Sequence, residues 1–151
     1  MNKIQVGDVL YRRKLLVQHA GVMLENGMVL HNSPTNGVEI CTFEQYSEGK
    51  EVKVISSELS FIEQKNFKLR AFELIEQARN YKLFDFNCEH LVTLVNNAKP
   101  SSTQLTAGFT GAAAGLIFAQ KSKNPLLTVG LFAIGGVLFS NATRKYDFTI
   151  N

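Results

Sequence analysis

A long apolar segment near the C-terminus places the strongest limit on how this chain can fold. Between Leu105 and Ala142 the only charged side chains are Lys121 and Lys123, which separate apolar stretches at about residues 104–119 and 126–142. Each stretch is close to the lower length limit for a helix that crosses a bilayer. We expect the two to form a helical hairpin, because small residues recur at every fourth position of the first stretch and let another helix approach closely; they are Ala107, Gly111, Gly115 and Ala119.

The second stretch has the same character. Gly130, Gly135 and Gly136 fit the same close packing, and Arg144-Lys145 follow at a position typical of lipid headgroups. The hairpin either enters a membrane or consists of two glycine-rich helices that pack on the rest of the chain in water. Glycine weakens helices in water and is better tolerated in a bilayer, so we expect a membrane anchor.

The composition changes at Lys99-Pro100-Ser101-Ser102, a short polar stretch that is typical of a linker. A chain of 151 residues holds one domain of ordinary size, but a second core of that size would not fit. We therefore expect a soluble domain at residues 1–98, a linker at residues 99–104 and the apolar helical hairpin at residues 105–151.

Charge and cysteine content narrow the partners and the compartment. Sixteen basic and thirteen acidic side chains give a net charge of +3, and no basic run is dense enough for a nucleic-acid groove, so no nucleic-acid partner is expected. Cys41 lies inside an apolar strand-like run, whereas Cys88 lies just before an apolar helical pattern. These different settings argue against a disulfide framework. Two free thiols fit a reducing compartment, so we expect the soluble domain to face the cytosol.

Short β-favouring runs in the first half predict a small antiparallel sheet, with strands near residues 8–11, 19–24, 28–31, 38–43 and 51–55. Asn26-Gly27 favours a tight turn with positive φ, so the second and third strands should form a hairpin. His19 and His31 would then be near neighbours on paired strands. Apolar residues at helical spacing predict an amphipathic helix from about residue 66 to residue 80.

Cys88 is expected in the first turn of a second helix, because Asn87 is a good N-cap and an apolar helical face follows it. A helix N-terminus and a nearby imidazolium both favour the reactive thiolate. His90 lies two residues away and points in another direction on a helix, so the base must be one of the other histidines. We assign His19 as general base and His31 as the residue that orients His19.

Each of these residues also has a purely structural interpretation. Free cysteine is among the most buried residue types. On composition alone, a cysteine such as Cys88 is more often a small buried residue than a nucleophile. The two strand histidines are equally compatible with ordinary hydrogen-bonded positions. Glu89 is an acidic residue in a first helical turn, where it favours the helix dipole.

The run Asn87-Cys88-Glu89-His90-Leu91-Val92 resembles the signature of the lecithin retinol acyltransferase-like family. The segment from His19 to Met23 resembles the family's first histidine segment, and Val29-Leu30-His31 resembles the second. The opening Val6-Gly7-Asp8-Val9-Leu10 is similar to its first strand. The resemblance covers roughly residues 4 to 97, with two histidines preceding the cysteine.

This resemblance implies an α+β, circularly permuted papain-like catalytic domain at residues 1–98, in which the small antiparallel sheet precedes the cysteine-bearing helix. It implies a phospholipase or acyltransferase in which Cys88 forms a thioester with the acyl group of a phospholipid or other acyl ester, without cofactor or metal. His19 is then the base and His31 the third member, whereas Asn87, Glu89 and His90 are structural. Family members commonly have an aromatic residue where this chain has Ala20, which leaves the preferred acyl group open.

Two other functions remain open at the level of sequence. In the first, Cys88 attacks an amide and not an ester, as in the cysteine peptidases and amidases that share the wider fold. The chain is alternatively a membrane-associated interaction protein without catalysis, although the trio of His19, His31 and Cys88 argues against that interpretation.

Overall fold

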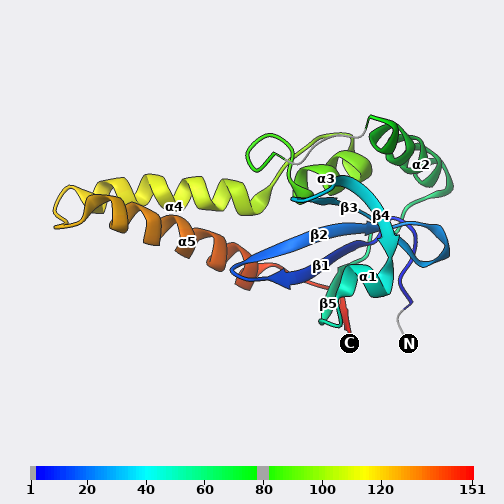
Figure 1. Ribbon diagram of the computed structural model, residues 1–151, viewed down its shortest axis with the longest axis horizontal. Coiled ribbons are helices and arrows are strands. Elements are labelled where there is room, and N and C mark those ends of the chain that lie inside the picture. The colour runs from blue at the N-terminus through cyan, green and yellow to red at the C-terminus, as the bar shows by residue number, and fades with distance from the viewer. Residues whose placement is uncertain (1–2, 78–81) are drawn as a thin grey trace. The chain divides into compact units, whose positions relative to one another are not determined.

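The computed structural model describes residues 3–77 and 82–151, which divide into two compact units (Figure 1). The sheet unit consists of Met1–Arg13, His19–Ser101 and Lys145–Asn151, and the hairpin unit consists of Lys14–Gln18 and Ser102–Arg144. The turn between the first two strands therefore belongs with the apolar helices.

In the part of the chain that the structure describes, the sheet has six strands in the order β4-β3-β2-β1-β5-β6. Strand β1 pairs with β5, β2 with β3, β3 with β4, and β5 with β6, and each of these pairs is antiparallel. The predicted α+β class with an antiparallel sheet is confirmed. The strands are β1 (Val9–Lys14), β2 (Val17–Met23), β3 (Met28–Ser33), β4 (Gly37–Thr42), β5 (Val52–Ile55) and β6 (Phe148–Ile150).

The turn between β2 and β3 has the positive φ angles that were predicted for Asn26-Gly27. The short 3-10 turn η1 (Glu25–Gly27) contains Asn26 with φ 57° and Gly27 with φ 71°. Asparagine and glycine tolerate this left-handed backbone, which matches the twist of paired strands. The register runs from Met23 opposite Val29 to Gly21 opposite His31.

Among its described residues, the sheet unit has three helices: α1 (Phe43–Ser47), α2 (Phe61–Glu76) and α3 (Cys88–Asn97). Helix α1 was not predicted, although Thr42 and Gln45 form a capping box at its start. Helix α2 begins five residues before the predicted residue 66, because Ser60 and Glu63 form a capping box there. The predicted end of this helix, residues 78–80, lies outside the described residues.

Apolar side chains form a core cluster on each side of the sheet, because successive strand residues point to opposite faces. One cluster joins strand residues such as Val22 and Leu30 to helices α2 and α3, and Cys88 belongs to it. The other gathers Met23 and Val29 around Tyr46 of α1.

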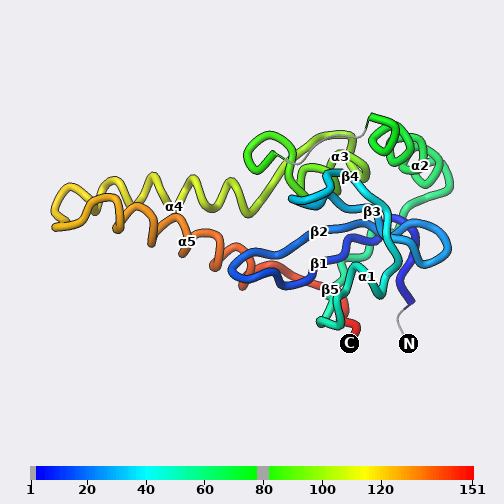
Figure 2. The backbone as a smooth tube through the Cα atoms, viewed as in Figure 1, coloured from blue at the N-terminus to red at the C-terminus, as the bar shows by residue number. Residues whose placement is uncertain are grey.

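The last strand, β6, falls in the stretch that was expected to belong to the apolar hairpin. It pairs with β5, with Phe148 opposite Val54. Figure 2 shows the C-terminal segment, in red, close to β5. The Asp147 carboxylate accepts a hydrogen bond of 2.7 Å from the backbone N–H of Ser56, and the Asp147 N–H donates to the Val54 carbonyl at 2.9 Å. The chain therefore returns to the sheet unit after its apolar helices.

The hairpin unit contains the two predicted apolar helices, α4 (Thr103–Ala119) and α5 (Pro125–Thr143), which lie side by side. A Cβ atom on Gly111 would lie 2.2 Å from the Phe132 carbonyl oxygen, and a Cβ on Gly136 would lie 2.2 Å from that of Ala107. These glycines thus permit direct backbone contact between the helices. Among the described residues, α5 is the one helix long and apolar enough to span a bilayer.

The prediction was wrong for two other glycines of α5. A Cβ on Gly130 or Gly135 would meet nothing within 4 Å, so the close approach of the two helices does not require glycine at either position. The stripe on α4 was easier to predict, because its small residues recur at helical spacing.

Candidate functional site

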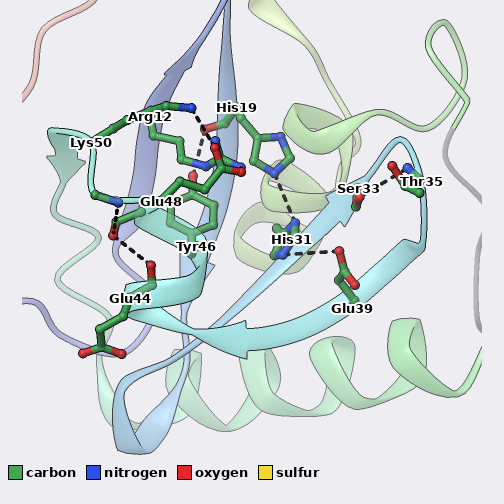
Figure 3. Close-up of polar contacts among 12 residues, drawn as sticks. Arg12, His19, His31, Ser33, Thr35, Glu39, Glu44, Tyr46, Glu48 and Lys50 are labelled. Atoms are coloured by element: carbon green, nitrogen blue, oxygen red, sulfur yellow. Dashed lines mark hydrogen bonds and ion pairs between the residues drawn. The ribbon is translucent and has the colours of Figure 1, made fainter.

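The two strand histidines form a buried pair on β2 and β3. Nε2 of His19 lies 3.1 Å from Nδ1 of His31, and the rings meet edge to face with centroids 5.1 Å apart (Figure 3). The predicted proximity of these histidines is confirmed. The β2–β3 register brings them together, because His31 lies opposite Gly21, two residues from His19.

Tyr46, in α1, is a fully buried platform for both imidazole rings. Its ring stacks on His19 with a centroid distance of 5.7 Å and meets His31 at 5.6 Å. Its single hydroxyl hydrogen is shared between two acceptors, the carbonyls of His19 at 2.8 Å and Leu10 at 2.9 Å. Burial raises the pKa of Tyr46 well above its ordinary value, so the hydroxyl stays protonated and can donate.

Arg12 covers another part of the same tyrosine. Its guanidinium lies 5.4 Å from the Tyr46 ring centroid and pairs with the Glu48 carboxylate at 2.6 Å. Glu48 in turn pairs with Lys50 at 2.7 Å (Figure 3). Arg12 is itself buried. Its contacts with Tyr46 and Glu48 therefore hold the short helix α1 against β1, the strand that carries Arg12.

Glu39 completes a polar chain behind the histidines. Its Oε1 atom lies 3.7 Å from Nε2 of His31, which it faces across β3 and β4. When neutral His31 carries its proton on Nε2, toward this carboxylate, its Nδ1 is an acceptor. Nε2–H of His19 then donates to it, which makes Nδ1 of His19 the nitrogen that accepts a proton.

Cys88 begins α3 at the place where β2 and β3 separate. The pairing of these strands ends where Gly21 lies opposite His31. The backbone N–H of Ala20, the residue before Gly21, forms a hydrogen bond with the Cys88 sulfur that lowers the pKa of the thiol. On the β3 side, the Asn32 amide donates to the Phe86 carbonyl at 2.7 Å. The segment that carries the cysteine is thus held between the strands that carry the histidines.

The pKa of the Cys88 thiol reflects both its burial and its position at the start of α3. Burial raises the pKa of the Cys88 thiol, and this effect outweighs the opposing backbone N–H groups of Ala20, Glu89 and Cys88 itself. The Glu89 carboxylate raises the pKa further. The backbone N–H groups at the start of α3 lower the pKa of the thiol, as the helix position implied, but burial outweighs them because it disfavours the charged form. A reaction at this sulfur needs a base.

The residues around Cys88 form the helix start. The Asn87 side-chain oxygen accepts hydrogen bonds from the N–H groups of Glu89 at 3.0 Å and His90 at 3.1 Å. Nδ1 of His90 accepts from the Asn87 N–H at 3.2 Å, which completes a capping box. Glu89 is buried. Burial lowers the pKa of His90, so the neutral ring that this bond requires is favoured.

We expect His90→Gln to keep the stability of the chain at neutral pH and to reduce its loss in mild acid. Glutamine at this position can accept the same N–H without titrating. Because the folded pKa of His90 is lowered, its contribution is full above the ordinary value of 6.5 and is lost as the pH falls below it. Urea unfolding followed by circular dichroism in detergent micelles at pH 7.5 and 5.5 measures both effects.

His90→Ala is the matched control for this substitution. It removes the cap at every pH, with a loss of about 1 kcal/mol. An equal acid-dependent loss in wild type and His90→Gln would contradict the proposed role of the neutral ring.

Sequence reasoning missed Glu39, Tyr46, Arg12 and Asn32. For Glu39 the signal was only partial, because Asn36-Gly37 favours a turn but a two-residue loop there would place Thr42 opposite His31. In the structure Ser33 pairs with Gly37, and this register brings Glu39 opposite His31. Tyr46 had no such signal, since its place under the histidines depends on tertiary packing of a five-residue helix.

An apolar cavity of about 310 Å³ lies between α2 and strands β3 and β4, and neither the two histidines nor Cys88 lines it. Within residues 3–77 and 82–151, no group of three or more His, Cys, Asp or Glu side chains has the geometry to hold a metal ion.

Comparisons with known proteins do not identify a family for this chain. No protein-family model matches it, and no curated protein matches it significantly.

Proposed function

We propose that this chain is a thiol acyl-transfer enzyme that acts on phospholipids at a membrane, with Cys88 as nucleophile, His19 as general base and His31 as orienting residue. The observation that carries the proposal is the buried bond of 3.1 Å between His19 and His31, on strands that also hold the Cys88 segment. Its motif resemblance to lecithin retinol acyltransferase-like proteins supports the same assignment and a circularly permuted papain-like domain.

The proposed reaction begins with transfer of the Cys88 proton to Nδ1 of His19. The sulfur attacks the ester carbonyl carbon, the carbon–oxygen bond breaks, and the lysophospholipid leaves with the proton from His19. The second half returns the acyl group from the thioester to water, an amine or a hydroxyl, whose proton passes through His19 to the Cys88 sulfur. His31 and Glu39 stabilise the positive charge on His19 between these steps.

The hairpin unit supports the choice of a membrane substrate. None of the nineteen residues of α5 is buried, and large apolar side chains such as Leu131 and Phe139 are exposed along it. An apolar surface of this kind is typical of contact with lipid. The small-residue contact between α4 and α5 is also typical of helix packing in a bilayer.

Connectivity supports a hairpin that enters the membrane and returns. The chain leaves the sheet unit after Ser101 and re-enters it at Lys145, and β6 then pairs with β5. A single crossing would place the bilayer between β6 and its partner strand. Helix α5 spans about 28 Å, near the bilayer core thickness of about 30 Å. Helix α4 is shorter, about 25 Å, and crosses as the second arm of the hairpin in this proposal. Lys121 and Lys123 then reach the opposite headgroups.

The two cysteines support a cytosolic face for the sheet unit. Neither Cys41 nor Cys88 forms a disulfide. Free thiols persist in reducing compartments, whereas oxidising compartments favour disulfides.

The test is an assay of the purified full chain in vesicles of phosphatidylcholine or phosphatidylethanolamine. We expect release of fatty acid and lysophospholipid, and slower turnover of matched amides. Faster cleavage of the amides would favour a cysteine amidase or peptidase. No turnover, together with no selective reaction of Cys88 with iodoacetamide, would favour a non-catalytic interaction protein.

A further inference from the structure

The turn between β1 and β2 exposes three consecutive apolar side chains. Leu15 is 87% exposed, Leu16 is 54% exposed and Val17 is 45% exposed. Leu15 has a φ of 56°, in the left-handed region that a leucine rarely adopts. Turns in water usually carry polar residues at such positions. The exposed side chains of Leu15, Leu16 and Val17 therefore form a surface suited to contact with an apolar environment.

Hydrogen bonds within the hairpin unit fix this turn at one end of the apolar helices. The side-chain amide of Gln104, in the first turn of α4, accepts from the Gln18 N–H and donates to the Gln18 carbonyl, both at 2.9 Å. Asn141, in the last turn of α5, donates to the Leu16 carbonyl at 3.4 Å. The turn thus lies beside the point where α4 begins and α5 ends.

The charges of the hairpin unit have one sign. Lys14–Gln18 and Ser102–Arg144 contain four basic side chains and no acidic one. Lys14 adjoins the exposed turn, and Arg144 contacts the Thr103 hydroxyl at the same end of the helices. Lys121 and Lys123 mark the other end. An apolar tip beside basic side chains matches the interface of a bilayer that contains anionic lipids.

We propose that the β1–β2 turn inserts Leu15, Leu16 and Val17 into the interface of an anionic phospholipid bilayer, where α4 enters and α5 leaves it. This proposal rests on the proposed membrane insertion of the hairpin. The bonds to Gln104 and Asn141 place the turn within about one helical turn, roughly 5 Å, of the helix ends. The turn adds a shallow third contact to the two deep helices.

The absence of tryptophan from the sequence gives a direct test. Leu15→Trp places a single reporter on the turn, and the full chain is reconstituted in vesicles that contain phosphatidylserine and phosphatidylcholine brominated at a shallow or a deep acyl position. We expect a loss of tryptophan emission that is larger with shallow than with deep bromines. The loss should decrease when phosphatidylserine is omitted.

Two further variants separate the possible failures. Leu131→Trp, exposed in the middle of α5, should be quenched by deep bromines, and Phe61→Trp, exposed at the start of α2, should not be quenched. Quenching of Leu131→Trp without quenching of Leu15→Trp would overturn the turn proposal and leave the anchor intact. Quenching of neither would overturn the anchor and the turn proposal together.

Three other results would also overturn the turn proposal. Equal quenching of Leu15→Trp and Phe61→Trp would show that the contact is not specific to the turn. Quenching that does not change without phosphatidylserine would remove the role of anionic lipid. A blue shift of Leu15→Trp that depends on protein concentration, without quenching by lipid, would assign the turn to contact with a second copy of the chain.

Discussion

Replacing Cys88 by serine is expected to reduce fatty acid release from phosphatidylcholine vesicles by about three orders of magnitude or more. A serine hydroxyl is a much weaker acid than a thiol. His19 would therefore remove the hydroxyl proton much less readily than the thiol proton, and the attack on the ester would be slower. His19→Ala should have an effect of similar size, because burial raises the Cys88 pKa and leaves the thiol protonated near neutral pH. The rate of fatty acid release from the purified full chain is the measurement.

Cys41→Ser is the matched control for this pair. Cys41 is the other free cysteine, lies on β4 and is only partly buried. It should retain the wild-type rate, because nothing in the proposed reaction uses it. Activity that survives in Cys88→Ser, or is lost in Cys41→Ser, would assign the chemistry to another group.

Gly136→Ala is expected to destabilise the helical hairpin by roughly 1–3 kcal/mol. The added Cβ would lie 2.2 Å from the Ala107 carbonyl oxygen, which belongs to the backbone of α4 and cannot rotate away. The two helices would have to separate, with loss of the packing that the small residues allow. The midpoint of unfolding in a titration with sodium dodecyl sulfate, followed by circular dichroism, measures the change.

The neighbouring glycine provides a control of opposite sign. A Cβ on Gly135 would meet nothing within 4 Å. Gly135→Ala should therefore leave the midpoint unchanged or raise it, since alanine favours a helix over glycine by about 0.5–1 kcal/mol. Equal destabilisation by the two substitutions would show that the close contact at Gly136 does not hold the hairpin together.

Local sequence signals were sufficient to predict the parts of the site that depend on neighbouring residues. Asn26-Gly27 predicted the turn that brings His19 and His31 together, and Asn87 predicted the helix that begins at Cys88. In each case a short-range preference of the backbone determines the structure.

Features that depend on contacts between distant residues were not predicted. Strand β6 follows a long apolar segment, and only its pairing with β5 makes it a strand. The position of Tyr46 beneath both histidines depends on packing of α1 against β1 and β2. The raised pKa of Cys88 depends on its burial, which the helix position alone does not reveal.

The most direct test of the role of Cys88 is to detect the acyl-enzyme. Wild-type protein is incubated with phosphatidylcholine vesicles, quenched in acid, digested and examined by mass spectrometry. We expect the mass of the lipid acyl chain on the peptide that contains Cys88, its removal by neutral hydroxylamine, and its absence from His19→Ala. An acyl group on Cys41 instead, or fatty acid release with Cys88 unmodified, would contradict the proposal that Cys88 is the nucleophile.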